Sequence, residues 1–132
     1  MSNTDLKEFY GRYIAAINAR DLDQVAEMLH DAVTVNGAPA KREDVLAALA
    51  GIPDAVPDFH WEVQDLYVED DRIAARLQDS GTPTKTFLGM EPTGAAIDII
   101  EYGSYRIRDG RFAEMWFLMD AATARQQLQS LK

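Results

Sequence analysis

The stretch Ile97–Met119, IDIIEYGSYRIRDGRFAEMWFLM, decides the fold because it reads as two strands joined by a tight turn. At its centre, Asp109-Gly110 is a strong signal for a two-residue hairpin, since the turn that matches the strand twist needs positive φ. Before the turn, alternate residues predict one shared strand face, made up of Ile97, Ile99, Glu101, Gly103, Tyr105 and Ile107. An acidic side chain therefore lies on an otherwise largely apolar face.

After the turn, the strand Arg111–Met119 carries large apolar residues on both faces. One predicted face carries Ala113, Met115, Phe117 and Met119, and the other carries Phe112, Glu114, Trp116 and Leu118. A strand that is apolar on both faces needs cover on both sides. We expect helices on one face and a second copy of the chain on the other, against Trp116 and Leu118, giving a homodimer.

The segments outside this hairpin predict helices first and antiparallel strands afterwards. Apolar spacing predicts helices over residues 6–17, from Asp21 onward, over 45–49 with an end at Gly51 and Pro53, and near the C-terminus through Leu128 and Leu131. Short strands are expected at 33–35, from 59 onward and over 72–79, with turns at Asn36-Gly37 and Asp70-Asp71. This order predicts an α+β domain with the helices gathered on one sheet face.

Composition limits the function classes. A chain of 132 residues fits a single domain, 1–132, and its 13 basic and 22 acidic residues give a net charge of −9. That charge argues against nucleic acid and anionic membranes as partners. There is no Cys, and the two histidines, His30 and His60, are too far apart in sequence to suggest a metal site. No apolar run could span a membrane and Met1–Asp5 does not resemble a signal peptide, so we expect a cytoplasmic protein.

Several segments, in order along the chain, resemble the SnoaL-like polyketide cyclases and ketosteroid isomerase of the nuclear transport factor 2-like superfamily. The N-terminal similarity lies in residues 13–23, YIAAINARDLD. The remaining similarity lies in GT (81–82), FLG (87–89), PTG (92–94), YRIxDGR (105–111), Glu114-x-Trp116 and Asp120. The resemblance implies a cone-shaped α+β barrel (nuclear transport factor 2-like, or cystatin-like), in which a curved antiparallel sheet carries the N-terminal helices on its concave face. It also implies a homodimer, a small apolar or aromatic ligand, and chemistry without a metal or organic cofactor.

The catalytic residues of the isomerase are only partly kept. Its oxyanion tyrosine corresponds to Tyr13. Its general-base aspartate corresponds to Asn36, which cannot take up a proton. Its second oxyanion donor, a protonated aspartic acid that is itself a standard example of a raised carboxyl pKa, corresponds to Gly103.

The catalytic residues of the cyclases are also replaced. The catalytic aspartate corresponds to Phe117, and the two site histidines correspond to Gly103 and Met115. A glutamine of the site corresponds to Glu101, and a histidine common after the Gly-Thr pair is Pro83. Neither activity is therefore transferred from the resemblance alone.

Four polar residues are candidates for catalysis: Glu101, Tyr13, Asn36 and Asp120. Glu101 forms either an ion pair with Arg76 or Arg106, or a carboxylate of raised pKa in an apolar pocket, where it would act as an acid/base. Tyr13 is either a core residue or a donor to a ligand oxygen, Asn36 either a turn residue or a ligand contact, and Asp120 either a helix N-cap or a site residue. The expected substrate-binding wall consists of Ile17, Phe59, Trp61, Ile99, Tyr105, Met115, Phe117 and Met119.

Two functions remain open from the sequence. The first is a cofactor-independent enzyme of cyclase or isomerase type that abstracts a proton beside the carbonyl of a small apolar compound. Glu101 would be the base, and Tyr13 or Asn36 would stabilise the enolate oxygen. The alternative is a ligand-binding or dimerisation module that has kept the pocket and lost the chemistry.

Overall fold

Six strands form one curved sheet in the order β2-β1-β6-β5-β4-β3 in the computed structural model, which describes residues 1–129. The strands are β1 (Leu29–Val35), β2 (Ala38–Lys41), β3 (His60–Glu69), β4 (Arg72–Gly81), β5 (Ile97–Arg108) and β6 (Arg111–Met119). The helices are α1 (Asn3–Asn18), α2 (Leu22–Glu27), α3 (Arg42–Ala55) and α4 (Ala121–Gln129).

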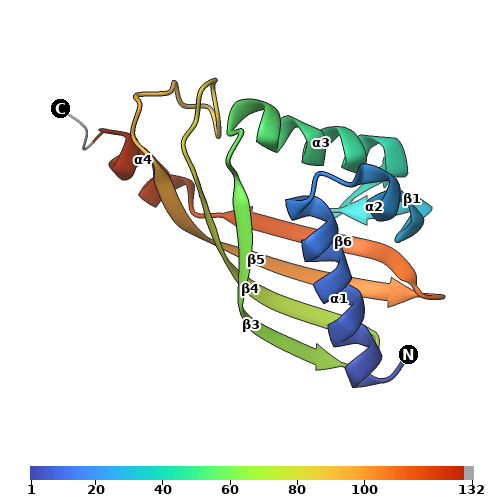
Figure 1. Cartoon of the computed structure of the whole chain (residues 1–132). Coiled ribbons are helices and arrows are strands. Elements are labelled where there is room, and N and C mark those ends of the chain that lie inside the picture. Colours follow the sequence, from blue (N-terminus) through green and yellow to red (C-terminus); the bar gives the residue numbers. More distant parts are fainter. Residues whose placement is uncertain (130–132) are drawn as a thin grey trace.

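The helices lie mainly on the concave side of the sheet (Figure 1). Helix α1 crosses this side and contacts β3 and β4, α3 covers the region near β1 and β2, and α4 packs beside β5. The predicted α+β class with helices on the concave face is confirmed. The sheet does not close into a full barrel, and β1 runs parallel to β6, so the sheet is mixed rather than wholly antiparallel.

The hairpin that we predicted from residues 97–119 is present. Asp109 and Gly110 both have positive φ, 52° and 75°, and β5 and β6 pair in antiparallel register up to the turn. The predicted N-cap of the second helix is also confirmed, because the Asp21 carboxylate accepts a hydrogen bond of 3.1 Å from the Gln24 backbone N–H.

Two local predictions are wrong. Helix α3 does not end at Gly51 and Pro53 but continues to Ala55. A helical hydrogen bond from the Val56 N–H to the Ile52 carbonyl, 2.8 Å, holds this last turn without needing the N–H that Pro53 lacks. The expected helical residue Leu131 lies outside the described residues.

The second error concerns Phe112, which we placed on the outer face with Trp116. An irregularity in the β5–β6 register near Ile107 turns Phe112 inward, where it is completely buried with its ring centroid 4.9 Å from that of Phe9. Strict alternation from the sequence fails wherever a bulge adds a residue to one strand.

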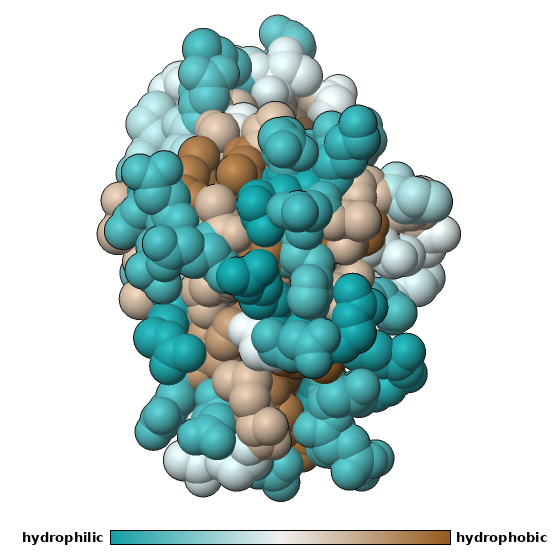
Figure 2. All heavy atoms as spheres, turned by 90° about the vertical axis from the view of Figure 1, so that its right-hand side faces the viewer, coloured by the Kyte–Doolittle hydropathy of each residue, from teal (hydrophilic) through white to brown (hydrophobic). Residues whose placement is uncertain are grey.

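The surface is strongly polar. Figure 2 shows one side of the molecule, on which hydrophilic side chains cover most of the area and apolar atoms emerge in smaller areas between them. Across residues 1–129, none of the helices is both long and apolar enough to cross a membrane.

Candidate active site

A cavity of about 270 Å³ lies between the concave face of the sheet and helices α1 and α3. Most of its wall is apolar, and its polar side chains are Tyr13, Asn36, Asp44, Trp61, Glu101 and Tyr105. This combination of an apolar wall with a few polar groups is typical of a small-molecule site. None of the described residues contributes a basic side chain to the wall.

Glu101 is the buried carboxyl group of this wall. Its side chain projects from the middle of β5 on the concave face, and the residue is only 3% exposed. Neither arginine that we considered as a partner reaches it: Arg76 pairs with Asp65 on the outer face, and Arg106 lies 3.7 Å from Asp71. Burial raises the pKa of Glu101, although the nearby Asp79 carboxyl and Trp61 side chain act to lower it.

Asp79 is a second buried acid that the sequence analysis missed. It projects from β4 onto the same face and is completely buried. Both of its oxygens, and Oε1 of Glu101, accept no hydrogen bond among residues 1–129. Burial, followed by the neighbouring Glu101 carboxyl, raises the pKa of Asp79 well above its ordinary value. The alternation Ile73, Ala75, Leu77, Asp79 contained the signal that this acid faces inward.

Three tyrosines lie close to the cavity. The hydroxyls of Tyr10 and Tyr105 are 3.1 Å apart and share a hydrogen bond, and Tyr13 and Tyr105 line the cavity wall. Among residues 1–129, no hydrogen bond involves the Tyr13 hydroxyl, which remains available to a ligand. Burial raises the pKa of all three phenols above the ordinary value, so they are neutral hydrogen-bond donors at neutral pH.

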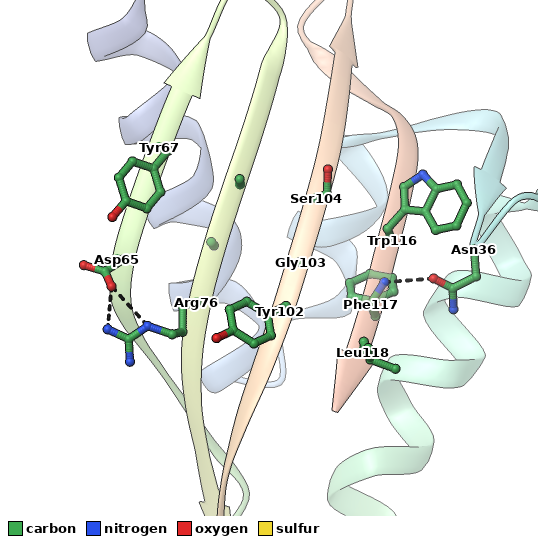
Figure 3. Close-up of a pocket in the computed structure, with 12 residues that line it drawn as sticks. Asn36, Asp65, Tyr67, Arg76, Tyr102, Gly103, Ser104, Trp116, Phe117 and Leu118 are labelled. Carbon is green, nitrogen blue, oxygen red and sulfur yellow. Dashed lines mark hydrogen bonds and ion pairs between the residues drawn. The ribbon is translucent and has the colours of Figure 1, made fainter. Parts of the chain in front are cut away.

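Asn36 occupies the turn between β1 and β2, with a positive φ of 50° that asparagine tolerates well. Its Oδ1 accepts a hydrogen bond of 2.9 Å from the Phe117 backbone N–H (Figure 3), which fixes the amide group between two strands. Asn36 is exposed and borders both this cavity and a hollow on the outer face of the sheet, so its NH₂ group lies at the edge of the cavity. Asn36 is therefore both a turn residue and a residue of the cavity wall.

Comparison with known proteins identifies the family of this chain. The profile of the SnoaL-like polyketide cyclases matches residues 7–128. The chain belongs to the SnoaL-like polyketide cyclase family. No curated protein matches the chain.

Solved structures of SnoaL-like and related proteins have the same fold. TsrD from Streptomyces laurentii is 27% identical, with 99% of each chain covered and a TM-score of 0.88. IdmH from Streptomyces antibioticus, provisionally assigned as a polyketide cyclase, is 27% identical over 93% of this chain and 97% of that chain, with a TM-score of 0.83. AclR from Streptomyces galilaeus, provisionally assigned as a hydroxylase, is 25% identical over 99% of this chain and 100% of that chain, with a TM-score of 0.83.

Gly103, for which the sequence resemblance implied a catalytic position of the family, lies directly beneath Tyr105. A Cβ atom built on Gly103 would lie 2.3 Å from the Tyr105 hydroxyl oxygen and 2.8 Å from the Cζ of the same ring. The Tyr105 phenol therefore fills the space in which a side chain at position 103 would stand. A hydrogen-bonding group is present there, although it comes from two residues further along β5.

Most of the expected substrate wall of this SnoaL-like site lines the cavity: Ile17, Trp61, Tyr105, Phe117 and Met119. Three expected wall residues do not line it. Phe59 makes edge-to-face contacts with Trp61 and Phe87, with ring centroids 4.5 Å and 5.8 Å away, while Ile99 and Met115 are enclosed in the core. These three face inward but lie in the packed layer beyond the cavity.

Asp120 does not contribute to the cavity. It lies exposed between β6 and α4, where Oδ1 accepts a hydrogen bond of 3.0 Å from the Thr123 N–H. Hydrogen bonds from Thr123 lower the pKa of Asp120. The geometry is that of a helix N-cap, one of the two roles that the sequence suggested, and not that of a site residue.

The outer face of the sheet carries a second, shallower hollow. Figure 3 shows Tyr67, Tyr102, Trp116 and Leu118 on this face, with the helices on the far side of the sheet. These four side chains are 67%, 57%, 44% and 72% exposed, respectively. Asp65 and Arg76 form an ion pair beside them, with Nε of Arg76 3.0 Å from Oδ2 of Asp65.

Proposed function

We propose that the chain is a cofactor-independent enzyme of cyclase or isomerase type, acting on a small apolar carbonyl compound in the concave cavity. The observation that carries the proposal is Glu101, a nearly buried carboxyl in an apolar wall, with no cationic partner in the part of the chain that the structure describes. A base with a raised pKa is matched to proton abstraction near neutral pH. In this mechanism Glu101 removes a proton from the carbon beside the carbonyl and returns it at another position.

The developing enolate oxygen needs hydrogen-bond donors. The free hydroxyl of Tyr13 and the NH₂ group of Asn36 are the donors on the cavity wall with no other acceptor among residues 1–129. Such donors stabilise charge that develops in the transition state more strongly than the ground-state carbonyl. We assign Tyr13 and Asn36 this role, and we no longer include Asp120 in the proposed site.

The test is Glu101→Gln, which keeps the side-chain shape and removes the proton acceptor. Small aromatic and polyketide-like ketones are first screened for an increase in the melting temperature of the wild-type protein. For each ligand that binds, Glu101→Gln should abolish exchange of the proton beside the carbonyl, followed by NMR in D₂O. Ligand affinity should change by less than about 2 kcal/mol, the worth of one lost hydrogen bond. Glu62→Gln on the exposed side of β3 is the matched control.

A non-catalytic binding module is the second candidate. It is favoured by the resemblance described above, which implies that Gly103, Met115 and Phe117 stand at catalytic positions of the family. Ligand binding without proton exchange in the wild-type protein would select this candidate. Exchange that persists in Glu101→Gln would remove Glu101 from the mechanism.

We also propose that the chain forms a homodimer through the outer face of the sheet. The supporting observation is the cluster of four exposed apolar or aromatic side chains, Tyr67, Tyr102, Trp116 and Leu118. Exposed apolar patches of this kind mark interaction surfaces, and a two-fold pairing is the commonest closed arrangement. The cytoplasmic location expected from the sequence stays a prediction.

A further inference from the structure

The most unusual pair of side chains in the molecule is Asp79 and Glu101. The two strands pair with Leu77 opposite Glu101 and Asp79 opposite Ile99, so the two acids are diagonal neighbours on one face of the sheet. They are 0% and 3% exposed. A buried acid normally has a cation or several hydrogen-bond donors nearby.

Within residues 1–129, every titratable or polar side chain that faces the pair is neutral or acidic. Trp61 of β3 lies opposite Asp79, and Tyr10 and Tyr13 approach from α1. Tyr105 lies on the same face of β5 as Glu101, four residues further along the strand. Asp44 of α3, which is exposed, adds a further carboxylate at the cavity wall. Two arginines of β4 and β5, Arg76 and Arg106, pair with Asp65 and Asp71 and do not reach the pair.

Two adjacent carboxylates in such surroundings cannot both be ionised, because each would be desolvated and would repel the other. A hydrogen bond between them exists only if one of the two carries a proton. The deeper group, Asp79, has no other partner for either oxygen. Glu101 has Trp61 beside it and borders the cavity, so the negative charge is better placed on Glu101.

We propose that Asp79 and Glu101 share a single proton at neutral pH, with Asp79 as the protonated partner that donates a hydrogen bond to the Glu101 carboxylate. Asp79 is then a positioning residue: it keeps Glu101 ionised and orients it, but does not touch the substrate. When Glu101 accepts a proton from the substrate, the pair holds two protons and is neutral. When Glu101 returns that proton, the original charge is restored, so Asp79 keeps its own proton throughout.

The shared proton is testable without any substrate. In protein labelled with ¹³C at the carboxyl carbons of Asp and Glu, the wild type at pH 7 should show one protonated buried Asp signal. Asp79→Asn should remove this signal, and Asp98→Asn, on the exposed side of β5, should not. Two ionised carboxylates at pH 7, or a protonated signal that belongs to Glu101, would overturn the proposal.

The effect on catalysis rests on the proposed function, and two variants separate it from a loss of folding. Asp79→Asn keeps a hydrogen-bond donor beside Glu101, so kcat/KM at pH 7 should stay within about tenfold of the wild type. Asp79→Leu removes the donor, so the acidic limb of the kcat/KM profile should move up by at least about one pH unit, a tenfold loss on that limb. Equal pH profiles for the Asn and Leu variants would overturn the positioning role.

The two proposals fail separately. If the NMR spectrum shows the protonated Asp79 but Glu101→Gln still turns over substrate, the shared proton stands and the proposed mechanism falls. If Glu101→Gln is inactive but both carboxyls are ionised at pH 7, the mechanism stands and the shared proton falls.

Discussion

The acidic side chains on the two faces of the sheet differ in their partners. On the outer face, Asp65 pairs with Arg76, and Asp98 accepts a hydrogen bond of 2.7 Å from Gln78. On the concave face, Asp79 and Glu101 have no cationic partner among residues 1–129, and only the Trp61 side chain beside Glu101 adds to their mutual contact. Partnered surface acids contribute little to stability, whereas desolvated, unpartnered acids lower it. The concave pair is therefore expected to lower the stability of the fold, in contrast to the acids of the outer face.

The largest expected effect concerns the pH dependence of stability. An acid whose pKa is raised by folding keeps its proton in the native state after the unfolded chain has lost it, so stability falls as pH rises above the unfolded value. The unfolded pKa is near 4, and each pH unit corresponds to about 1.4 kcal/mol. The unfolding free energy of the wild type should therefore fall by about 4 kcal/mol between pH 4 and pH 7 because of the shared proton. Urea denaturation of the wild type and Asp79→Asn across this range measures the difference.

The outer face supplies the control for this measurement. Asp65→Asn breaks a half-exposed ion pair, so its unfolding free energy should follow that of the wild type to within about 1 kcal/mol at each pH. If the unfolding free energies of Asp79→Asn and the wild type change in parallel from pH 4 to pH 7, the predicted difference between the two faces is contradicted.

The second prediction concerns the apolar side chains of the outer face. The double variant Trp116→Ser/Leu118→Ser should weaken the homodimer at least about a hundredfold, equivalent to 2.8 kcal/mol, because aromatic anchors dominate interfaces. Sedimentation velocity over a concentration series measures this change. Leu88→Ser, at an exposed apolar position away from this face, should leave association unchanged. A wild type that is monomeric at micromolar concentration would contradict the proposed dimer.

The third prediction concerns the space beneath Tyr105. Gly103→Ala places a methyl group 2.3 Å from the Tyr105 hydroxyl, so the ring must move and its hydrogen bond to Tyr10 must break. Overpacking of this kind costs about 1–3 kcal/mol. Gly11→Ala, on α1 where an added Cβ meets nothing within 4 Å, should instead stabilise the protein by up to about 1 kcal/mol. Equal unfolding free energies for the two variants would show that the Tyr105 ring moves aside without a loss of stability.

Much of the fold could be predicted because it depends on local signals. The Asp109-Gly110 turn, the apolar stripe of α1 and the Asp21 cap are each encoded within a few residues. The bulge that turns Phe112 inward and the continuation of α3 through Pro53 depend on neighbouring elements instead. Spacing along one segment carries no information about those neighbours.

The candidate site likewise combines features that local sequence signals predict with features that depend on neighbouring strands. Alternation placed Glu101 correctly on an apolar face, but the expected strand ended at Asp79, where a polar residue looks like a strand terminus. Strand β4 continues to Gly81, and only its register against β5 brings Asp79 beside Glu101. Similarly, alternation turns Ile99 and Met115 inward without revealing that they lie beyond the cavity.

The smallest predicted effect tests whether Asp120 belongs to the concave chemistry or to the exterior. As an N-cap, its carboxylate accepts hydrogen bonds from the Thr123 N–H and hydroxyl, 3.0 Å and 2.6 Å away, so Asp120→Ala should lower the unfolding free energy by about 1 kcal/mol. Asn is an equally good N-cap but cannot ionise. Asp120→Asn should therefore keep both wild-type stability, measured by urea denaturation, and wild-type turnover of any substrate that Glu101 converts. Loss of turnover in Asp120→Asn at unchanged stability would give Asp120 a chemical role, and the acids that matter for catalysis would no longer be confined to the concave face.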